Sequence, residues 1–252
     1  MDELLFYNLL LIAFGFSSII VFIVLFYVTA GYGQHVSKKW GTSINNKLGW
    51  LLMEIPTVII YLIYYIIGNR RFDLIPLIFM FVWMLHYCQR TFVFPLLIHG
   101  KEPMPISIII LGFTFNGFNT YLQARWINSF APPYNISWIY SSLFITGIII
   151  FFCGFIINLH SDFIIRNLRK PGETEYKIPY GGMFKYVSCP NYFGEITEWI
   201  GWAIMTWSLP GLIFAVWTFA NLAPRARSNH LWYNKTFSDY PNNRKALIPF
   251  IF

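Results

Sequence analysis

Long apolar runs separated by short polar stretches dominate the 252-residue chain. A helix needs about twenty apolar residues to cross the ~30 Å hydrocarbon core of a bilayer. The runs of that length are 4–30, 49–68, 73–98, 104–127, 135–158 and 192–222. The pattern therefore predicts a chain of membrane-spanning helices, with a polar block at 159–190 before the last run.

The last run contains the sequence Ser208-Leu-Pro-Gly211. Pro and Gly together interrupt helices, so we expect two short spans here instead of one long span. The predicted fold is an all-α integral membrane protein, a seven-transmembrane helical bundle that forms a single domain over residues 1–252.

Lys and Arg residues predict the orientation, because they are enriched in cytosolic loops. With the N-terminus outside and the C-terminus in the cytosol, fourteen of the 18 lie on the cytosolic side. Three lie on the opposite side, and Arg90 lies within a span. The multi-pass protein would reside in a bacterial inner membrane or in the endoplasmic reticulum membrane.

Composition agrees with this class of protein. Hydrophobic residues make up 56% of the chain and charged residues only 12%, and the mean hydropathy is +0.52. The net charge of +7 is explained by orientation in the membrane, so we expect no nucleic-acid partner. Three widely spaced cysteines, with no metal-ligand spacing, indicate neither a disulfide framework nor a metal site.

Glu54 stands near the start of the second apolar run, in "WLLMEIPTVIIYLIYYII". It could be a first-turn carboxylate, which the helix N-terminus tolerates. An ionisable group within a span is costly, however, and usually faces an interior cavity. Glu54 is therefore a candidate site residue.

The third run carries a second polar patch, "LHYCQRT". His86, Gln89 and Arg90 would share one face of a regular helix, and Tyr87 and Arg90 would be neighbours three residues apart. Several polar groups in the middle of a span need partners or water. We expect this patch to line a site.

The polar block and the C-terminal tail are rich in Arg, Asn and Tyr. Asn158, Asp162, Arg166 and Arg169 recur at helical spacing, and the tail adds further basic residues. A solvated cytosolic loop would explain this composition. Because the planar guanidinium group binds phosphate well, a phosphate-bearing cofactor would explain it too. Both interpretations remain open on spacing alone.

Several stretches resemble the steroid 5α-reductase family of NADPH-dependent membrane reductases. They are "GYGQH", "LLMEIP", "HYCQRTFVFPLL", "NLHSDFIIRNLRKPGE", "IPYGGMFKYVSCPNYFGEITEWIGWA" and "FSDYPNNRKALIPFIF". The resemblance extends over nearly the whole chain. It implies a seven-span bundle in which residues 1–130 mainly serve the substrate and residues 131–252 mainly bind the cofactor.

The resemblance also implies the site residues. Glu54 and Tyr87 would contact the steroid 3-ketone, with Tyr32 and Trp50 near the substrate. The implied NADPH-binding residues are Arg90, Asn158, Asp162, Arg169, Tyr176, Asn191, Glu195, Arg225, His230, Tyr233, Arg244 and Lys245. We expect a monomer whose lipophilic steroid substrate enters from the bilayer.

The resemblance implies conjugate reduction of a 3-oxo-Δ4-steroid, such as a testosterone- or progesterone-like molecule, to the 5α-steroid. Negative charge moves to the carbonyl oxygen as hydride arrives, and Glu54 and Tyr87 would stabilise it by hydrogen bonding. To donate, Glu54 must carry a proton, which an apolar setting favours. Alternatives are a reductase of a sterol or enoyl-CoA, an S-adenosylmethionine-dependent lipid methyltransferase, a proton-coupled transporter, or a purely structural membrane protein.

Overall fold

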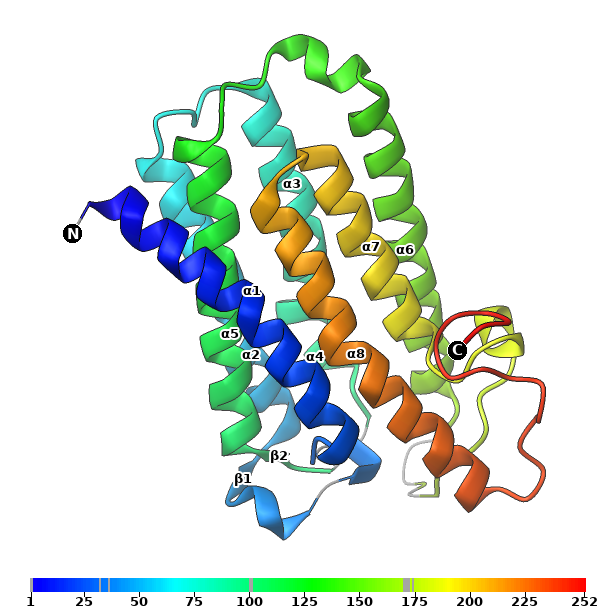
Figure 1. The fold of residues 1–252 in the computed structure, drawn as a ribbon. Helices are drawn as coiled ribbons and strands as arrows, with labels where there is room; N and C mark the ends of the chain where they lie inside the picture. Colours follow the sequence, from blue (N-terminus) through cyan, green and yellow to red (C-terminus); the bar gives the residue numbers. More distant parts are fainter. Residues whose placement is uncertain (1, 32, 36, 100–101, 170–172, 174) are drawn as a thin grey trace. The chain divides into compact units, whose positions relative to one another are not determined.

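The computed structural model describes residues 2–31, 33–35, 37–99, 102–169, 173 and 175–252 (Figure 1). Long helices occupy each of the seven predicted ranges. They are α1 (Glu3–Tyr27), α2 (Asn46–Ile67), α3 (Leu74–Cys88), α5 (Ile106–Arg125), α6 (Ser142–Asn167), α7 (Pro190–Thr206) and α8 (Leu209–Thr236).

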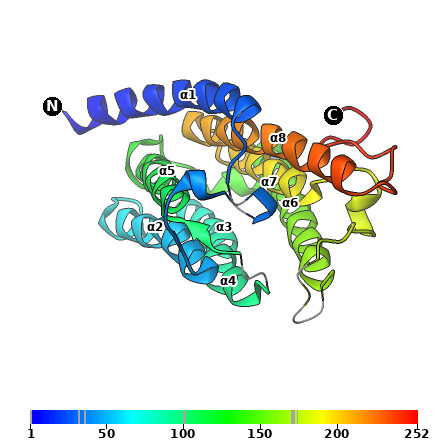
Figure 2. The same cartoon turned by 90° about the horizontal axis from the view of Figure 1, so that it is seen from below.

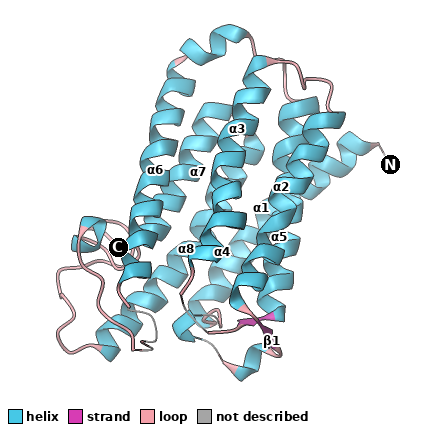
Figure 3. Ribbon diagram, turned by 180° about the vertical axis from the view of Figure 1, so that it is seen from behind, coloured by secondary structure: helices cyan, strands magenta, loops and turns pink. Residues whose placement is uncertain are grey.

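Shorter elements complete the secondary structure. The two-residue strands β1 (Ser43–Ile44) and β2 (Met104–Pro105) pair in antiparallel fashion and are the magenta arrows of Figure 3. In the described part of the connections lie helix α4 (Phe94–Leu97) and six one- or two-turn helices. The six are η1 (Gly33–His35), η2 (Lys38–Trp40), η3 (Gln89–Val93), η4 (Trp126–Phe130), η5 (Ile136–Tyr140) and η6 (Gly182–Lys185).

Four of the helical segments are long and apolar enough to cross a membrane among the described residues: Glu3–Tyr27, Asn46–Ile67, Leu74–Leu97 and Ser142–Asn167. Their outer faces carry large apolar side chains, such as Phe16 and Ile20 on α1, which suits contact with lipid. The protein thus has the helical make-up of a multi-pass membrane protein. The number of seven spans and the orientation remain predictions.

Two predicted boundaries are corrected by the structure. The run expected at 135–158 begins with the 3₁₀-helix η5, and α6 starts only at Ser142 and continues to Asn167. The apolar pattern does not reveal this shift, because residues 136–140 carry no charge and contain neither Pro nor Gly to mark a helix boundary. The predicted break near Ser208 is present: α7 ends at Thr206, and the Ser208 hydroxyl caps α8 by accepting from the Gly211 N–H at 3.1 Å.

The chain forms two compact units that interleave along the sequence. Unit 1 contains residues 1–13 and 30–144, and unit 2 contains residues 14–29 and 145–252. Helix α1 therefore contributes its first part to unit 1 and its remainder to unit 2. The division of labour predicted between 1–130 and 131–252 remains a prediction.

In unit 1, α2 packs along α5, and Figure 2 shows the two helices as neighbours. The close approach depends on Gly112, because a Cβ there would overlap the side chain of Met53. Small residues at such contacts are a common means of packing helices in membranes.

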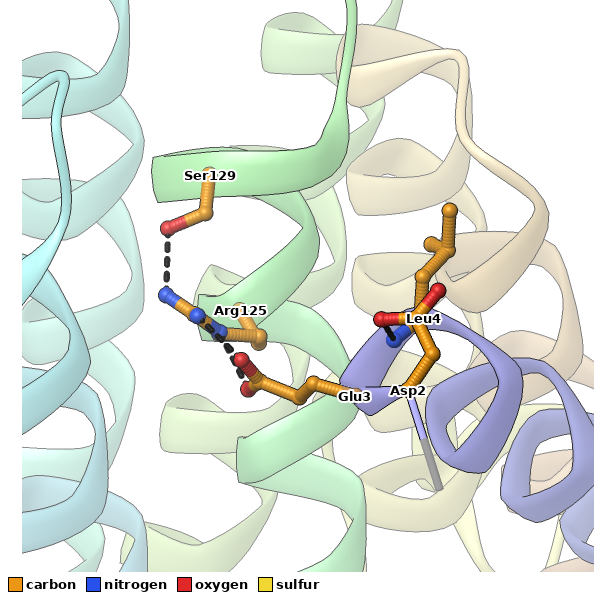
Figure 4. Close-up of polar contacts among 5 residues, drawn as sticks. All are labelled: Asp2, Glu3, Leu4, Arg125 and Ser129. Carbon is orange, nitrogen blue, oxygen red and sulfur yellow. Dashed lines mark hydrogen bonds and ion pairs between the residues drawn. The ribbon is translucent and has the colours of Figure 1, made fainter.

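The beginning of α1 is fastened to α5 within the same unit. Tyr7 donates its hydroxyl hydrogen to the Leu122 carbonyl at 2.8 Å, and Glu3 forms a two-pronged ion pair with Arg125 at 2.7 and 2.6 Å (Figure 4). Arg125 also donates to Ser129 at 2.7 Å.

The helix that follows α3 departs from the regular period. Residues Gln89–Val93 form the π-helix η3, which widens the turn before α4. Short π segments occur often at functional sites. The face shared by His86, Gln89 and Arg90 in a regular helix is altered as a result: His86 and Arg90 are buried, whereas Gln89 is only half-buried.

In unit 2, α6 and α7 pack backbone to backbone through glycines. A Cβ on Gly194 would lie 2.6 Å from the backbone nitrogen of Asn158, and one on Gly201 would overlap the backbone nitrogen of Phe151. Helix α8 packs against α7, as Figure 1 shows. The later part of α1 joins this unit through Trp217 of α8, which stacks on Phe14 and donates its indole N–H to Ser17 at 3.0 Å.

The C-terminal tail of unit 2 folds back onto the polar block. Ser188 and Cys189 donate their backbone N–H groups to the carbonyls of Lys245 and Ala246, at 2.8 and 3.2 Å. Lys245 in turn donates to the Tyr186 carbonyl at 2.9 Å. These bonds hold the tail beside the start of α7, and so place several of the predicted cofactor residues on one framework.

Candidate functional site

Glu54 is buried within α2, at 8% exposure, so it is not a surface carboxylate. Its Oε2 atom accepts a hydrogen bond from Nδ2 of Asn116 on α5 at 3.1 Å. Its own carbonyl accepts from the Thr57 hydroxyl at 2.6 Å. Pro56, two residues on, lies inside α2 and lacks the backbone N–H that would otherwise bond to the carbonyl of Leu52.

Tyr87 is buried on α3, which packs against α2. Trp83, one turn earlier, connects the two helices. Its ring lies 4.6 Å from that of Tyr87 and 5.2 Å from that of Tyr61, and its indole N–H donates to the Thr57 carbonyl at 3.1 Å. The predicted pair, Glu54 and Tyr87, therefore belongs to one unit and to two neighbouring helices.

Arg90 and Trp50 form a second contact between the same elements. The Arg90 guanidinium lies 5.0 Å from the Trp50 ring and 4.3 Å from the Phe94 ring, which favours cation–π attraction to both rings. Arg90 is buried at 9% exposure. The structure thus places Arg90 in unit 1 with the predicted substrate residues, whereas the other predicted cofactor residues lie in unit 2. Tyr32, predicted near the substrate, lies outside the described residues.

The sequence analysis missed a stripe of buried polar residues on α5. Asn116, Asn119, Thr120 and Gln123 are all buried, and Gln123 donates to the Asn119 side-chain oxygen at 3.3 Å. Their spacing of three and four residues places them on one helix face. Polar residues at this spacing within an apolar run could have been recognised in the sequence, because the same pattern identified the polar patch of the third run.

In unit 2, the predicted residues at the α6–α7 contact meet one another. Asn158 donates its side-chain N–H to the Asn191 carbonyl at 3.0 Å, and Asn191 donates to Oδ1 of Asp162 at 3.3 Å. The chain of bonds fixes the side chains of Asn158 and Asn191 and directs an amide toward the carboxylate. Glu195, one turn further on α7, is half-buried.

A hydroxyl cluster joins the polar block to α8 and the tail. The Ser188 Oγ lies 2.6 Å from His230 Nδ1 and 2.7 Å from the Tyr240 hydroxyl. Burial, with the positive charge of Lys245 as the second cause, lowers the pKa of His230 below its ordinary value. His230 is therefore neutral at pH 7, and Tyr233 stacks on Tyr240 beside it at 5.1 Å.

Guanidinium groups and tyrosine rings face each other in the same unit. Arg225 donates to the Tyr192 hydroxyl at 3.3 Å, and burial lowers its pKa to about 10, so it keeps its charge at pH 7. Arg169 lies 4.9 Å from the Tyr176 ring. Lys245 has an exposed side chain.

Arg244 is the most buried of these cations, at 4% exposure, and its guanidinium lies 4.9 Å from the Tyr180 ring and 5.2 Å from the Tyr240 ring. Its Nη1 atom has no hydrogen-bond partner among the described residues. A buried guanidinium nitrogen without an acceptor is costly, and an anionic ligand would supply the missing acceptor. The predicted cationic cluster therefore fits a phosphate-bearing group.

Among the described residues, no group of three His, Cys, Asp or Glu side chains comes together in a way that could hold a metal ion. Within the same residues, Cys88, Cys153 and Cys189 are free thiols.

The sequence is similar to proteins of one family. Residues 102–252 match the family model described as 3-oxo-5-alpha-steroid 4-dehydrogenase. The chain is 42% identical to 3-oxo-5-alpha-steroid 4-dehydrogenase 1 of Rattus norvegicus over 254 aligned residues, which cover 100% of this chain and 97% of the relative.

Proteins of two other organisms are similar to the chain over its full length. Steroid 5-alpha-reductase DET2 of Gossypium hirsutum is 40% identical, and the alignment covers 100% of this chain and 99% of the relative. The Mus musculus 3-oxo-5-alpha-steroid 4-dehydrogenase 1 is 42% identical with 100% and 99% coverage. With the family model matched over more than half of the chain and relatives matched end to end, this protein belongs to the 3-oxo-5-alpha-steroid 4-dehydrogenase family, the steroid 5α-reductases.

Proposed function

We propose that this protein is an oxidoreductase that reduces the Δ4 double bond of 3-oxo-Δ4-steroids to 5α-steroids, with NADPH as the reductant. The observation that carries the proposal is end-to-end similarity to proteins named for this reaction, at 42% identity for the Rattus norvegicus relative. Glu54 is buried in a helix of a membrane protein. A carboxyl group in this position supports the proposal, because it can bond to the 3-keto oxygen of a largely apolar substrate.

Glu54 and Tyr87 are the groups proposed to act on the substrate. Reduction of the conjugated double bond moves negative charge onto the 3-keto oxygen. A protonated Glu54 and the Tyr87 hydroxyl donate hydrogen bonds to that oxygen, and these bonds strengthen as the charge develops. The burial of both side chains supports this role, because donors removed from water stabilise charge more strongly.

The residues of unit 2 are proposed to hold the cofactor. NADPH carries phosphates that suit Arg225, Arg244 and Lys245, and the unpartnered Nη1 of Arg244 supports an anion at this place. Hydrogen bonds join Asn158 to Asn191 and Asn191 to Asp162. These bonds would hold the three side chains in fixed orientations for contact with the uncharged part of the cofactor. Arg169, Tyr176, Glu195, His230 and Tyr233 complete the proposed set in unit 2, and Arg90 is the proposed cofactor residue of unit 1. When bound, NADPH supplies the hydride.

The route of the substrate follows from its solubility. A steroid partitions into the bilayer, and the apolar outer faces of the helices place the protein there. We propose that the substrate reaches unit 1 from the membrane and that the enzyme acts as a monomer in a multi-pass arrangement of seven spans.

The decisive experiment is a substrate panel with the purified protein and NADPH. The panel contains testosterone, progesterone, a Δ7- or Δ14-sterol and an enoyl-CoA. We expect NADPH oxidation with the two 3-oxo-Δ4-steroids and a product with the 5α ring fusion, determined by mass spectrometry and NMR. If only the sterol or only the enoyl-CoA were reduced, the protein would be a reductase of that substrate class and the proposed steroid substrate would be wrong. Methylation of a lipid with S-adenosylmethionine would refute the proposal.

A further inference from the structure

Asn116 is buried on α5, at 5% exposure, opposite the turn of α2 that carries Glu54. Its Nδ2 atom makes two hydrogen bonds, one to the Met53 carbonyl at 2.8 Å and one to Oε2 of Glu54 at 3.1 Å. The residue therefore binds a backbone atom and a carboxyl oxygen that are one residue apart on α2.

The backbone carbonyl determines which way the Asn116 amide faces. A carbonyl can only accept a hydrogen bond, so the group opposite Met53 must be the NH₂ and not the oxygen. The second hydrogen of the same NH₂ then remains for Glu54. Oε2 of Glu54 is consequently held as an acceptor, whichever protonation state the carboxyl adopts.

The packing of α5 on α2 maintains this geometry. Gly112, one turn before Asn116, lets the Met53 side chain lie against α5, as its own Cβ would overlap that side chain. At this level the two backbones are thus close enough for a short amide side chain to reach across. The close packing of the two helices therefore holds the Asn116 side chain in this contact.

We propose that Asn116 is a positioning residue that selects the proton-bearing oxygen of Glu54. With Oε2 occupied as an acceptor, the proton of the neutral acid resides on Oε1, and Oε1–H becomes the donor to the substrate carbonyl. Without Asn116, the proton distributes over both oxygens and the side chain can rotate. The inference rests on the proposed function, since it concerns the acid role of Glu54.

A double-mutant cycle tests the inference, because such a cycle measures how far one residue acts through another. In the wild-type background, Asn116→Leu is expected to lower kcat about tenfold, the effect of one lost hydrogen bond to a charged or charge-developing group. The Kd for NADPH stays unchanged. In a Glu54→Ala background, the same substitution should have no further effect on the residual kcat.

A purely structural role gives a different result. If Asn116 only supports α2 through the Met53 carbonyl, Asn116→Leu lowers kcat by the same factor in both backgrounds, and the inference is wrong. Asn116→Ala serves as a second variant, because it removes the amide without introducing a bulkier group. Both variants must give the same pattern.

An infrared measurement separates the inference from the proposed function. A protonated Glu54 gives a carboxylic acid C=O stretching band that Glu54→Gln removes. Asn116→Leu should move this band to higher frequency, because Oε2 loses its donor. A band that is present but unmoved overturns the inference and leaves the proposed function standing. Absence of any band sensitive to Glu54→Gln overturns the acid role of Glu54 itself.

Discussion

The buried polar groups of the two units differ in kind. In unit 1 most are amides and hydroxyls, such as Asn116 and Thr57, and they accompany the carboxyl of Glu54, the imidazole of His86 and the guanidinium of Arg90. In unit 2 the buried Arg244 and the half-buried Arg225 lie against tyrosine rings. The first arrangement suits a neutral ligand with one polar atom, and the second suits an anion. The difference agrees with the proposal that unit 1 binds an apolar ketone and unit 2 binds a charged dinucleotide.

The largest expected effect concerns unit 1. Glu54→Gln and Tyr87→Phe should each lower kcat by about 10²–10³, the usual effect of removing one donor to a developing oxyanion. The Kd for NADPH, measured by its fluorescence, should remain nearly constant. Tyr140→Phe, at an exposed tyrosine of the same unit, is the control and should retain full activity. If Glu54→Gln or Tyr87→Phe also weakened NADPH binding by a similar factor, unit 1 would not be limited to the substrate, and the proposed difference between the two units would be wrong.

The next effect concerns unit 2. Arg244→Met should raise the Kd for NADPH roughly 10- to 100-fold, since it removes a buried cation that would bind a phosphate. The kcat at saturating NADPH should change much less. Lys235→Met, at an exposed position of α8, is the matched control. An unchanged Kd in the Arg244 variant would place the phosphates elsewhere.

A third prediction concerns the packing that supports the cofactor residues. In Gly201→Ala the new methyl group overlaps the Phe151 backbone, which cannot move aside as a side chain could. Overpacking of about 1–3 kcal/mol should lower the Tm by about 2–10 °C. Gly15→Ala is the control, as its Cβ would meet only the Ile213 side chain, at 3.5 Å or more. Equal melting temperatures for the two variants would mean that α6 and α7 are not closely packed.

The smallest expected effect is a pH dependence in unit 2. His230 has a lowered pKa in the folded protein, so the unfolded chain binds more protons between that pKa and about 6.5. Stability from this group is present above pH 6.5 and is lost as the pH falls through that window. Between pH 7.5 and 5.5, the Tm of the wild type should fall by about 1–2 °C more than that of His230→Gln. A larger fall in the variant would contradict the assigned environment.

Much of the helical fold could be predicted from the sequence. Apolar runs predict helices because backbone polar groups in lipid must bond within the segment, and Ser-Leu-Pro-Gly marks the break before α8. The π-helix at Gln89–Val93 could not be predicted, since it depends on how one turn packs against its neighbours. The start of α6 at Ser142 was missed because the preceding apolar residues form a 3₁₀ turn.

The candidate site was only partly predictable. Glu54 and His86 drew attention because ionisable groups are rare in spans. Asn116, which bonds to Glu54, was not predicted. It lies 62 residues away in the sequence, and the pattern of polar residues does not indicate which carbonyl or carboxyl group an amide side chain will reach. That Arg244 Nη1 has no hydrogen-bond partner among the residues that the structure describes likewise follows only from the packing of the tail.

The interleaving of the two units has a consequence for biosynthesis. Ser17 is made early, but Trp217, which bonds to it, follows 200 positions later. At about 5–20 residues per second, translation takes roughly 10–40 s to deliver that partner. During this time the inner face of the later part of α1 has only lipid or the insertion machinery as its neighbour. Ribosome stalling after residue 144 should therefore leave residues 14–29, which include the later part of α1, without their partners in unit 2 and accessible to quality control.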